Sequence, residues 1–358
     1  MSLLVDSLSE LQLKAKERTV KTQTIEYDLE TLVKKIDKGL IKLNPDYQRN
    51  HRWSNETSSK LIESLILNIP VPFIYISQDI DVDEEVSDDV SRYSVIDGQQ
   101  RLTAIHDFFK NNYELTNLEV LSPLNGCRYK DLPPFLIRRL EERSIRCLRI
   151  DSTLDQQVKY DIFERLNSGA VKLEPQELRN ATCRGPFKKL IKELAKNKFF
   201  VINTNLTMKK KEKMEDEELV LRFFAFTHND GYKEYQGGLK KFLTTKMIEF
   251  NTIDSDGLKK FSGDFEQIMN KIHDEIGRIP FAKYKFENGE FQKMSDFNVS
   301  VFDAVVNLVK KAHAENKKVN KDIVLQLFKD SNFFAAVEGS TNDASKILKR
   351  IEMARDLI

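Results

Sequence analysis

The chain has 358 residues, which at about 150 residues per domain predicts roughly two domains, each large enough for its own core. Its 57 Lys and Arg against 56 Asp and Glu give a formal net charge of +1, which excludes a globally basic, DNA-coating surface. Any contact with nucleic acid must therefore be local. With 40% hydrophobic and 32% charged residues and a mean hydropathy of −0.47, the composition is typical of a well-ordered, helix-rich soluble protein.

The sequence offers no membrane span and no secretory signal. Its longest apolar runs fall short of the roughly 20 residues that cross a bilayer, and residues 1–20 mix both charges without an apolar segment. We therefore expect a cytoplasmic protein with no membrane partner. The cysteines are widely spaced and form no CxxC pair, so we expect reduced thiols rather than disulfides or a zinc site: Cys127, Cys147 and Cys183.

Strand-like and helix-like segments alternate through the first 180 residues, which predicts an α+β domain. We expect its strands at 24–29, 70–78, 92–98 and 145–150, and its helices at 29–39, 55–68, 99–112, 133–143 and 154–169. From about residue 171 the apolar spacing is almost wholly helical. The sequence therefore predicts two domains, an α+β domain over 20–180 and a mostly α-helical domain over 181–358.

The strongest local signal is the segment VIDGQQRLTAI at 95–105, in which an apolar strand runs through a glycine directly into a helix. A helix that begins at such a turn presents unpaired N–H groups and the positive end of its dipole, and this arrangement binds phosphate or another anion. Gly98 permits a close approach by the ligand. The guanidinium of Arg101, in the first turn, adds to the positive charge of the dipole, so we expect an anion or a carboxylate beside it.

Two interpretations of this turn remain open on spacing alone. In the first, Asp97 holds Mg²⁺ or orients water, and Gln99 or Gln100 positions a nucleophilic water for phosphoryl transfer. In the second, Arg101 merely pairs with Asp97 and the turn has a structural role.

A second group of candidates lies in NPDYQRNHRW at 44–53, ahead of a helix that Ser54 is expected to cap. Arg49, Arg52 and Trp53 suit the gripping of phosphate and the stacking of a base. They equally suit a surface loop that is anchored by a buried Trp53, because tryptophan commonly serves packing first.

A third group lies in the segment FERLNSG, where a helix ends in Asn167, Ser168 and a glycine. The two polar side chains can donate hydrogen bonds to a ligand, but the same residues are common at ordinary helix C-termini. Other site classes find no support, because the sequence contains no histidine pair with zinc-ligand spacing, no GxxxxGK[ST] and no GxSxG. A local DNA-backbone contact is best placed on the lysine-rich helix at 186–198.

Taken in order, these segments resemble the DGQQR-motif domain in the S half of GmrSD-type type IV restriction enzymes and in related phage-defence proteins. The resemblance covers about residues 20–225 and rests on NPDYQRNHRW, KLIESLILNIPVPFIYI, YSVIDGQQRLTAIHDFF, FERLNSG with LEPQELRNA, and DEELVLRFF. It implies a ParB/sulfiredoxin-like fold. Gly98, Arg101 and Ala104 form a GxxRxxA pattern similar to the phosphate-binding box of ParB nucleotide hydrolases.

The resemblance also implies the binding and hydrolysis of a nucleoside triphosphate, which regulates a nuclease that attacks modified phage DNA. We expect Mg²⁺ to screen the charge of the phosphates. The resemblance implies roles at the phosphates and the water for Asp97, Gly98, Gln99, Gln100 and Arg101, with Arg49 and Trp53 nearby, and we expect Asp97, Gln99, Gln100 and Arg101 to be catalytic. From their residue types, Arg52, Asn167 and Ser168 are further candidates for binding the nucleotide. The chain departs from GmrSD-type enzymes because it lacks a histidine-centred, HNH-like motif toward its C-terminus. If DNA is cut, we therefore expect the nuclease on a separate polypeptide.

Three functional hypotheses follow. The leading one is an NTP-hydrolysing protein of a phage-defence or type IV restriction-like system that regulates or recruits a nuclease. The second is a module that binds nucleotide or DNA phosphate as a sensor, without hydrolysis. The third is a ParB-like DNA nickase, which requires a carboxylate cluster for two metals, and the densest acidic stretch is at 79–89.

Overall fold

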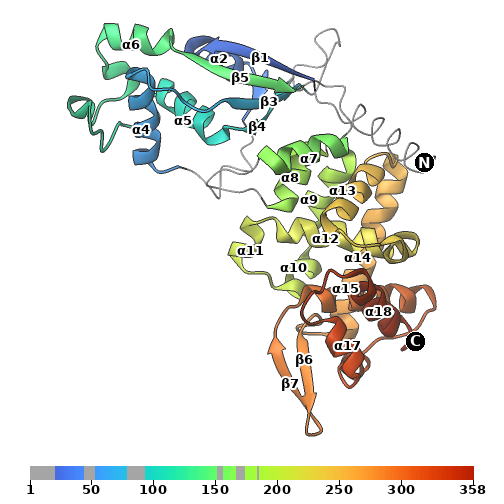
Figure 1. Cartoon of the computed structure of the whole chain (residues 1–358). Helices are drawn as coiled ribbons and strands as arrows, with labels where there is room; N and C mark the ends of the chain where they lie inside the picture. Colours follow the sequence, from blue (N-terminus) through green and yellow to red (C-terminus); the bar gives the residue numbers. More distant parts are fainter. Residues whose placement is uncertain (1–20, 44–52, 79–92, 151–155, 167–173, 184) are drawn as a thin grey trace, which may run out of the picture. The chain divides into compact units, whose positions relative to one another are not determined.

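The structure is a computed structural model that describes residues 21–43, 53–78, 93–150, 156–166, 174–183 and 185–358 (Figure 1). The chain divides into two compact units, Met1–Leu173 and Glu174–Ile358. The first contains a five-stranded sheet with helices, and the second is mostly helical. This arrangement confirms the predicted combination of an α+β part and an α-helical part.

A mixed sheet forms the centre of the first unit, with its strands in the order β1-β5-β3-β4-β2. The strands are β1 (Thr22–Asp28), β2 (Ile41–Lys42), β3 (Ile74–Gln78), β4 (Tyr93–Asp97) and β5 (Ser144–Ile150). β1 pairs antiparallel with β5 and β3 pairs antiparallel with β4, whereas β3 with β5 and β2 with β4 run parallel. The two-residue β2 was not predicted, because so short a strand leaves no alternation in the sequence.

Four helices bury their apolar faces with the sheet in one core. They are α2 (Leu29–Asp37), α4 (Asn55–Ile66), α5 (Gln99–Phe109) and α6 (Pro134–Glu141), and a further helix, α7 (Gln156–Leu166), follows β5. The predicted cap of α4 is confirmed, since Ser54 Oγ accepts the N–H of Thr57 at 3.2 Å. Two 3₁₀ turns, Ser122–Leu124 and Tyr129–Asp131, complete the connection from α5 to α6.

The second unit packs its helices around a large aromatic and aliphatic core. The helices are α8 (Pro175–Thr182), α9 (Pro186–Leu194), α10 (Lys198–Thr204), α11 (Met208–Glu212), α12 (Glu215–Thr227), α13 (Leu239–Phe250), α14 (Ser255–Ile276), α15 (Val299–Ala314), α16 (Lys321–Leu327), α17 (Ser331–Ala336) and α18 (Ala344–Arg355), with a 3₁₀ segment at His228–Glu234. None of the described helices combines the length and apolar character that a bilayer crossing demands.

One hairpin interrupts this helical unit and was not predicted. Its strands, β6 (Lys283–Glu287) and β7 (Glu290–Ser295), pair antiparallel and extend away from the helices (Figure 1). Asn288 and Gly289 form the turn, with φ of 52° and 85°. Asn-Gly is the strongest short hairpin signal a sequence carries, because both positions must adopt positive φ.

Helix α8 belongs with the second unit, seven residues before the division predicted after residue 180. It carries buried polar side chains whose partners lie on α12. The Asn180 amide donates to Glu217 Oε2 at 2.6 Å, and the Arg179 guanidinium pairs with Glu218. Buried polar groups are costly without such partners, so these contacts fix α8 in the helical unit.

The three cysteines are free thiols, as predicted from their spacing. Burial raises the pKa of the Cys147 thiol to about 12. A thiol with so high a pKa carries almost no thiolate at neutral pH and is chemically inert.

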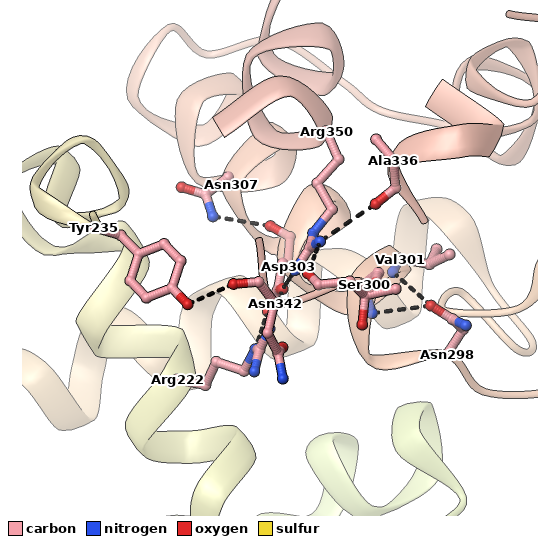
Figure 2. A network of polar contacts seen from close by, with 11 residues as sticks. Arg222, Tyr235, Asn298, Ser300, Val301, Asp303, Asn307, Ala336, Asn342 and Arg350 are labelled. Carbon is pink, nitrogen blue, oxygen red and sulfur yellow. Dashed lines mark hydrogen bonds and ion pairs between the residues drawn. The ribbon is translucent and has the colours of Figure 1, made fainter. Parts of the chain in front are cut away.

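A fully buried ion network joins three helices of the second unit (Figure 2). Arg222 on α12 donates through Nε and Nη2 to both carboxylate oxygens of Asp303 on α15, at 2.6 and 2.7 Å. Arg350 on α18 donates to the same carboxylate at 2.5 Å and to the carbonyl of Thr341 at 2.5 Å. Two guanidinium groups thus share one carboxylate, and the network holds a surplus positive charge away from water.

This charge imbalance predicts an unequal response to two substitutions. Asp303→Asn leaves both arginines without a counter-charge and should destabilise the second unit by about 3 kcal/mol. Arg350→Met should cost less than half of that, because the bidentate Arg222–Asp303 pair remains and the surplus charge is removed. Urea unfolding followed by far-UV circular dichroism measures both.

The single tryptophan, Trp53, provides an internal control, because it lies in the first unit. Its fluorescence transition should stay in place in both variants. Equal losses of stability in the two variants would show that the surplus charge carries no cost.

Candidate functional site

The segment at 95–105 folds as the end of β4, a left-handed glycine and the start of α5. The pairing of β3 with β4 shifts here, because Tyr75 is opposite Asp97 while the next residue, Ile76, is opposite Val95. β4 therefore carries one extra residue just before the turn. Such a bulge re-aims the side chain that follows it, and bulges are common next to functional sites.

Gly98 is required at this turn for two independent reasons. Its φ of 97° lies in the left-handed region, which other residues rarely adopt. A Cβ at this position would also lie 2.4 Å from Cδ1 of Ile74 on β3. The glycine thus lets the start of α5 lie directly against the sheet.

Arg101 is bound by acceptors of the protein itself. Its Nη2 donates to Asp97 Oδ2 at 2.7 Å, and its Nη1 donates to the carbonyls of Pro72 and Phe73 at 2.5 and 3.0 Å. The arginine side chain is only 11% exposed, whereas Asp97 is 39% exposed. The guanidinium therefore fixes the carboxylate and the segment before β3, while Asp97 still faces solvent.

Within the described part of the chain, hydrogen-bond donors without a partner remain at the start of α5. The helix has no side-chain cap, and its first intrahelical bond is donated by Leu102 to the carbonyl of Gly98. The amides of the preceding first turn lack an intrahelical acceptor for geometric reasons. In addition, Nε2 of Gln99 is buried and has no hydrogen-bond partner among the described residues. An unsatisfied buried donor costs about 1–3 kcal/mol, which an acceptor on a ligand would recover.

The structure brings together two of the segments that the sequence analysis singled out. The backbone N–H of Trp53 donates to Oε1 of Gln100 at 3.1 Å, although 47 residues separate the two. The Trp53 side chain is partly buried and packs against the core of the first unit. Trp53 thus packs against the core, as expected for a residue that anchors a loop, and it also lies beside the first turn of α5.

A cavity of about 420 Å³ lies between the start of α4 and one face of α5. Its floor is formed by buried residues, its rim by two exposed asparagines, Asn55 and Asn112, and its remaining wall by residues of intermediate exposure. The full lining is Trp53, Asn55, Ser58, Gln100, Thr103, Ala104, Asp107, Asn112 and Tyr113. The lining contains carboxamides, hydroxyls, one carboxylate and two aromatic rings, but no lysine or arginine of the described residues.

Several hydrogen bonds hold this lining in place. Asn112 Nδ2 donates to Asp107 Oδ1 at 3.2 Å, and the Tyr113 hydroxyl donates to the carbonyl of Ala104 at 3.1 Å. Burial, followed by the charge of Asp107, raises the pKa of Tyr113, so its hydroxyl stays protonated. The cavity is therefore a preformed polar site.

The side chains near the turn determine which metal ion could be bound there. Within the described part of the chain, no three His, Cys, Asp or Glu side chains form a group able to hold a metal ion. Mg²⁺ commonly takes one or two protein carboxylates and completes its shell with water and substrate phosphates. The solvent-facing carboxylate of Asp97 fits Mg²⁺ held jointly with a phosphate, and does not fit a metal caged by the protein alone.

Four sequence candidates, Arg49, Arg52, Asn167 and Ser168, lie outside the described residues, as does the acidic stretch at 79–89. Their assignment stays a prediction. By contrast, most of the cavity lining was not predicted from the sequence: Asn55, Ser58, Thr103, Asp107, Asn112 and Tyr113. A signal for part of it was present, because residues 100, 103 and 107 share one face of a helix and are all polar.

Residues 29–183 match the family model described as "GmrSD restriction endonuclease, N-terminal domain". The matched stretch contains the Gly98 turn and all residues that line the cavity. No curated protein and no solved structure matches the chain. The match supports a GmrSD-type N-terminal domain in this part of the chain, and with it a component of a restriction or phage-defence system.

The close approach of Gly98 to β3 can be tested by comparing Gly98→Ala with Gly126→Ala. Gly126 also has a positive φ, 87°, but a Cβ there would meet nothing within 4 Å. Gly126→Ala should therefore cost only backbone strain, about 1–2 kcal/mol. Gly98→Ala should cost at least about 1 kcal/mol more, because Ile74 must also move.

Urea unfolding followed by Trp53 fluorescence compares the two variants within the same unit. Equal losses of stability in the two variants would mean that Ile74 moves at no cost and that the turn tolerates a Cβ at position 98.

His106 gives a pH-dependent prediction for the far end of α5. The carboxylates of Asp107, 3.7 Å from Nδ1, and Asp37, 3.1 Å from Nε2, raise the pKa of His106 above its usual value. The stability contributed by His106 is thus fully present below the unfolded pKa of about 6.5, and is lost as pH rises through the higher folded pKa. The difference in unfolding free energy between wild type and His106→Gln should be larger at pH 5.5 than at pH 8.

NMR titration of the imidazole checks the direction of the shift. A pKa below that of a free histidine, or a difference that grows with pH, would contradict this account.

Proposed function

We propose that the first unit binds a nucleoside triphosphate with its phosphates at the Gly98 turn and hydrolyses it with Mg²⁺. In this proposal the protein regulates or recruits a nuclease of a restriction system directed against modified DNA. The observation that carries the proposal is the turn itself, in which a bulged strand, a left-handed glycine and an uncapped helix start adjoin a solvent-facing carboxylate.

Phosphate binding is supported by the donors at the start of α5. The first-turn amides and the helix dipole together attract an anion. The buried Nε2 of Gln99 adds a donor with no partner among the described residues. Gln99 is therefore the glutamine that we assign to the phosphates.

Asp97 and Arg101 have different roles in this proposal. Arg101 acts as a positioning residue, because its guanidinium is engaged by Asp97 and two carbonyls. Asp97 is held by one oxygen and would hold Mg²⁺ or a water through the other. Bound Mg²⁺ supplies neutralisation of the phosphate charge, as in other phosphoryl-transfer sites.

Binding without hydrolysis is the second candidate, and the internal pairing of Arg101 favours it. A guanidinium that already serves three acceptors is poorly placed to stabilise charge that develops in a transition state. In that case the nucleotide acts as a signal, and the unit is a sensor rather than an NTPase.

Thermal unfolding with ATP, GTP, CTP or UTP, each with Mg²⁺, tests binding, and phosphate release from the same samples tests hydrolysis. A ligand that binds only the folded state raises the melting temperature by mass action. Asp97→Asn should abolish the Mg²⁺-dependent part of this rise and lower any phosphate release by about 100-fold or more.

Asp37→Asn is the matched control, because Asp37 is also an ion-paired, half-exposed carboxylate but lies at the end of α2, bound to Lys110 and His106. It should leave both readouts as in wild type. Protection without phosphate release selects the sensor. No protection by any nucleotide rejects the nucleotide site.

A further inference from the structure

We propose that the cavity beside Gln100 binds the uncharged nucleoside half of the nucleotide, so that the ligand of this unit is a free nucleotide and not a nucleic-acid backbone. This inference rests on the proposed phosphate site at Gly98. It is carried by the charge, the shape and the position of the cavity.

The groups that line the cavity differ in chemistry from the amides at the Gly98 turn. Phosphate subsites commonly use cations or free backbone amides, whereas this cavity is lined by carboxamides, hydroxyls and the carboxylate of Asp107. Among the described residues that line it there is no cationic side chain, and the charge of Asp107 disfavours a phosphate beside it. The same groups suit the hydroxyls of a sugar and the polar edge of a base, and Trp53 and Tyr113 supply aromatic surface.

The size and form of the cavity also fit. Its volume of about 420 Å³ lies in the usual range of about 300–1,000 Å³ for small-ligand pockets. The buried Ser58 and Tyr113 form a fixed floor, while the exposed Asn55 and Asn112 leave the rim open. A base that stays stacked in a duplex cannot enter such a pocket, whereas a single nucleoside can fill it.

The position of the cavity connects it to the turn through one helix. Gln100 lies in the first turn of α5 and also lines the cavity, and Asp107 lines it two turns further on. At 1.5 Å per residue, these seven residues span about 10 Å. A ligand that reaches from the first-turn amides along this face must be elongated, charged at one end and uncharged at the other, as a nucleoside triphosphate is.

Calorimetric titration of the full chain separates the two halves of the ligand. The probes are ATP, GTP, CTP, UTP and inorganic tripolyphosphate, each with Mg²⁺. We expect the wild type to bind at least one nucleotide about tenfold or more tightly than tripolyphosphate, because only the nucleotide reaches the cavity. Asn55→Leu and Asn112→Leu, at the exposed rim, should remove this advantage and leave tripolyphosphate affinity unchanged.

Thr116→Leu is the control, because Thr116 is exposed in the chain segment that follows α5 but does not line the cavity. It should bind every probe as the wild type does. Unchanged nucleotide affinity in both rim variants overturns the inference while leaving the phosphate site intact, and so does a wild type that binds tripolyphosphate as tightly as any nucleotide. A wild type that binds none of the probes rejects the proposed function itself.

Discussion

The candidate site depends on the hydrogen bonds that Arg101 donates to Asp97 and to the carbonyls of Pro72 and Phe73. These bonds tie the first turn of α5 to the end of β4 and to the segment that enters β3. Because the guanidinium is almost buried, its own N–H groups would lack partners without these acceptors. The position of the Asp97 carboxylate, and hence any chemistry at the turn, follows from this arrangement.

The same interaction changes the role that the sequence suggests for the arginine. An arginine in the first turn of a helix stands next to the positive end of the dipole, so it requires negative charge nearby. In the structure that charge is Asp97, which matches the structural interpretation of the turn. The helix start has no side-chain cap, and Nε2 of Gln99 has no partner among the described residues, so the proposed anion site depends on these donors rather than on the guanidinium.

The second unit is a mostly helical body around a large hydrophobic core. Its most unusual feature, the Arg222–Asp303–Arg350 network, is buried and joins α12, α15 and α18. Burying such a network costs desolvation of every charged group, which the mutual attraction offsets only when the groups stay paired. The matched family stretch ends at residue 183 and therefore includes α8, the first helix of the second unit. A hydrogen bond from Asn180 to Glu217 on α12 holds α8 in this unit.

The sequence by itself determined the strands and helices with clear apolar periodicity, the cap at Ser54 and the glycine turn at Gly98, because each is a local property of a few adjacent residues. Only the tertiary structure decided what these elements do together. The acceptors of Arg101 include backbone carbonyls 28 and 29 residues away, and carbonyls leave no residue-specific mark in a sequence. The contact between Trp53 and Gln100, and the cavity beside it, likewise arise where α4 packs along α5, and packing of distant segments is not a local property of either.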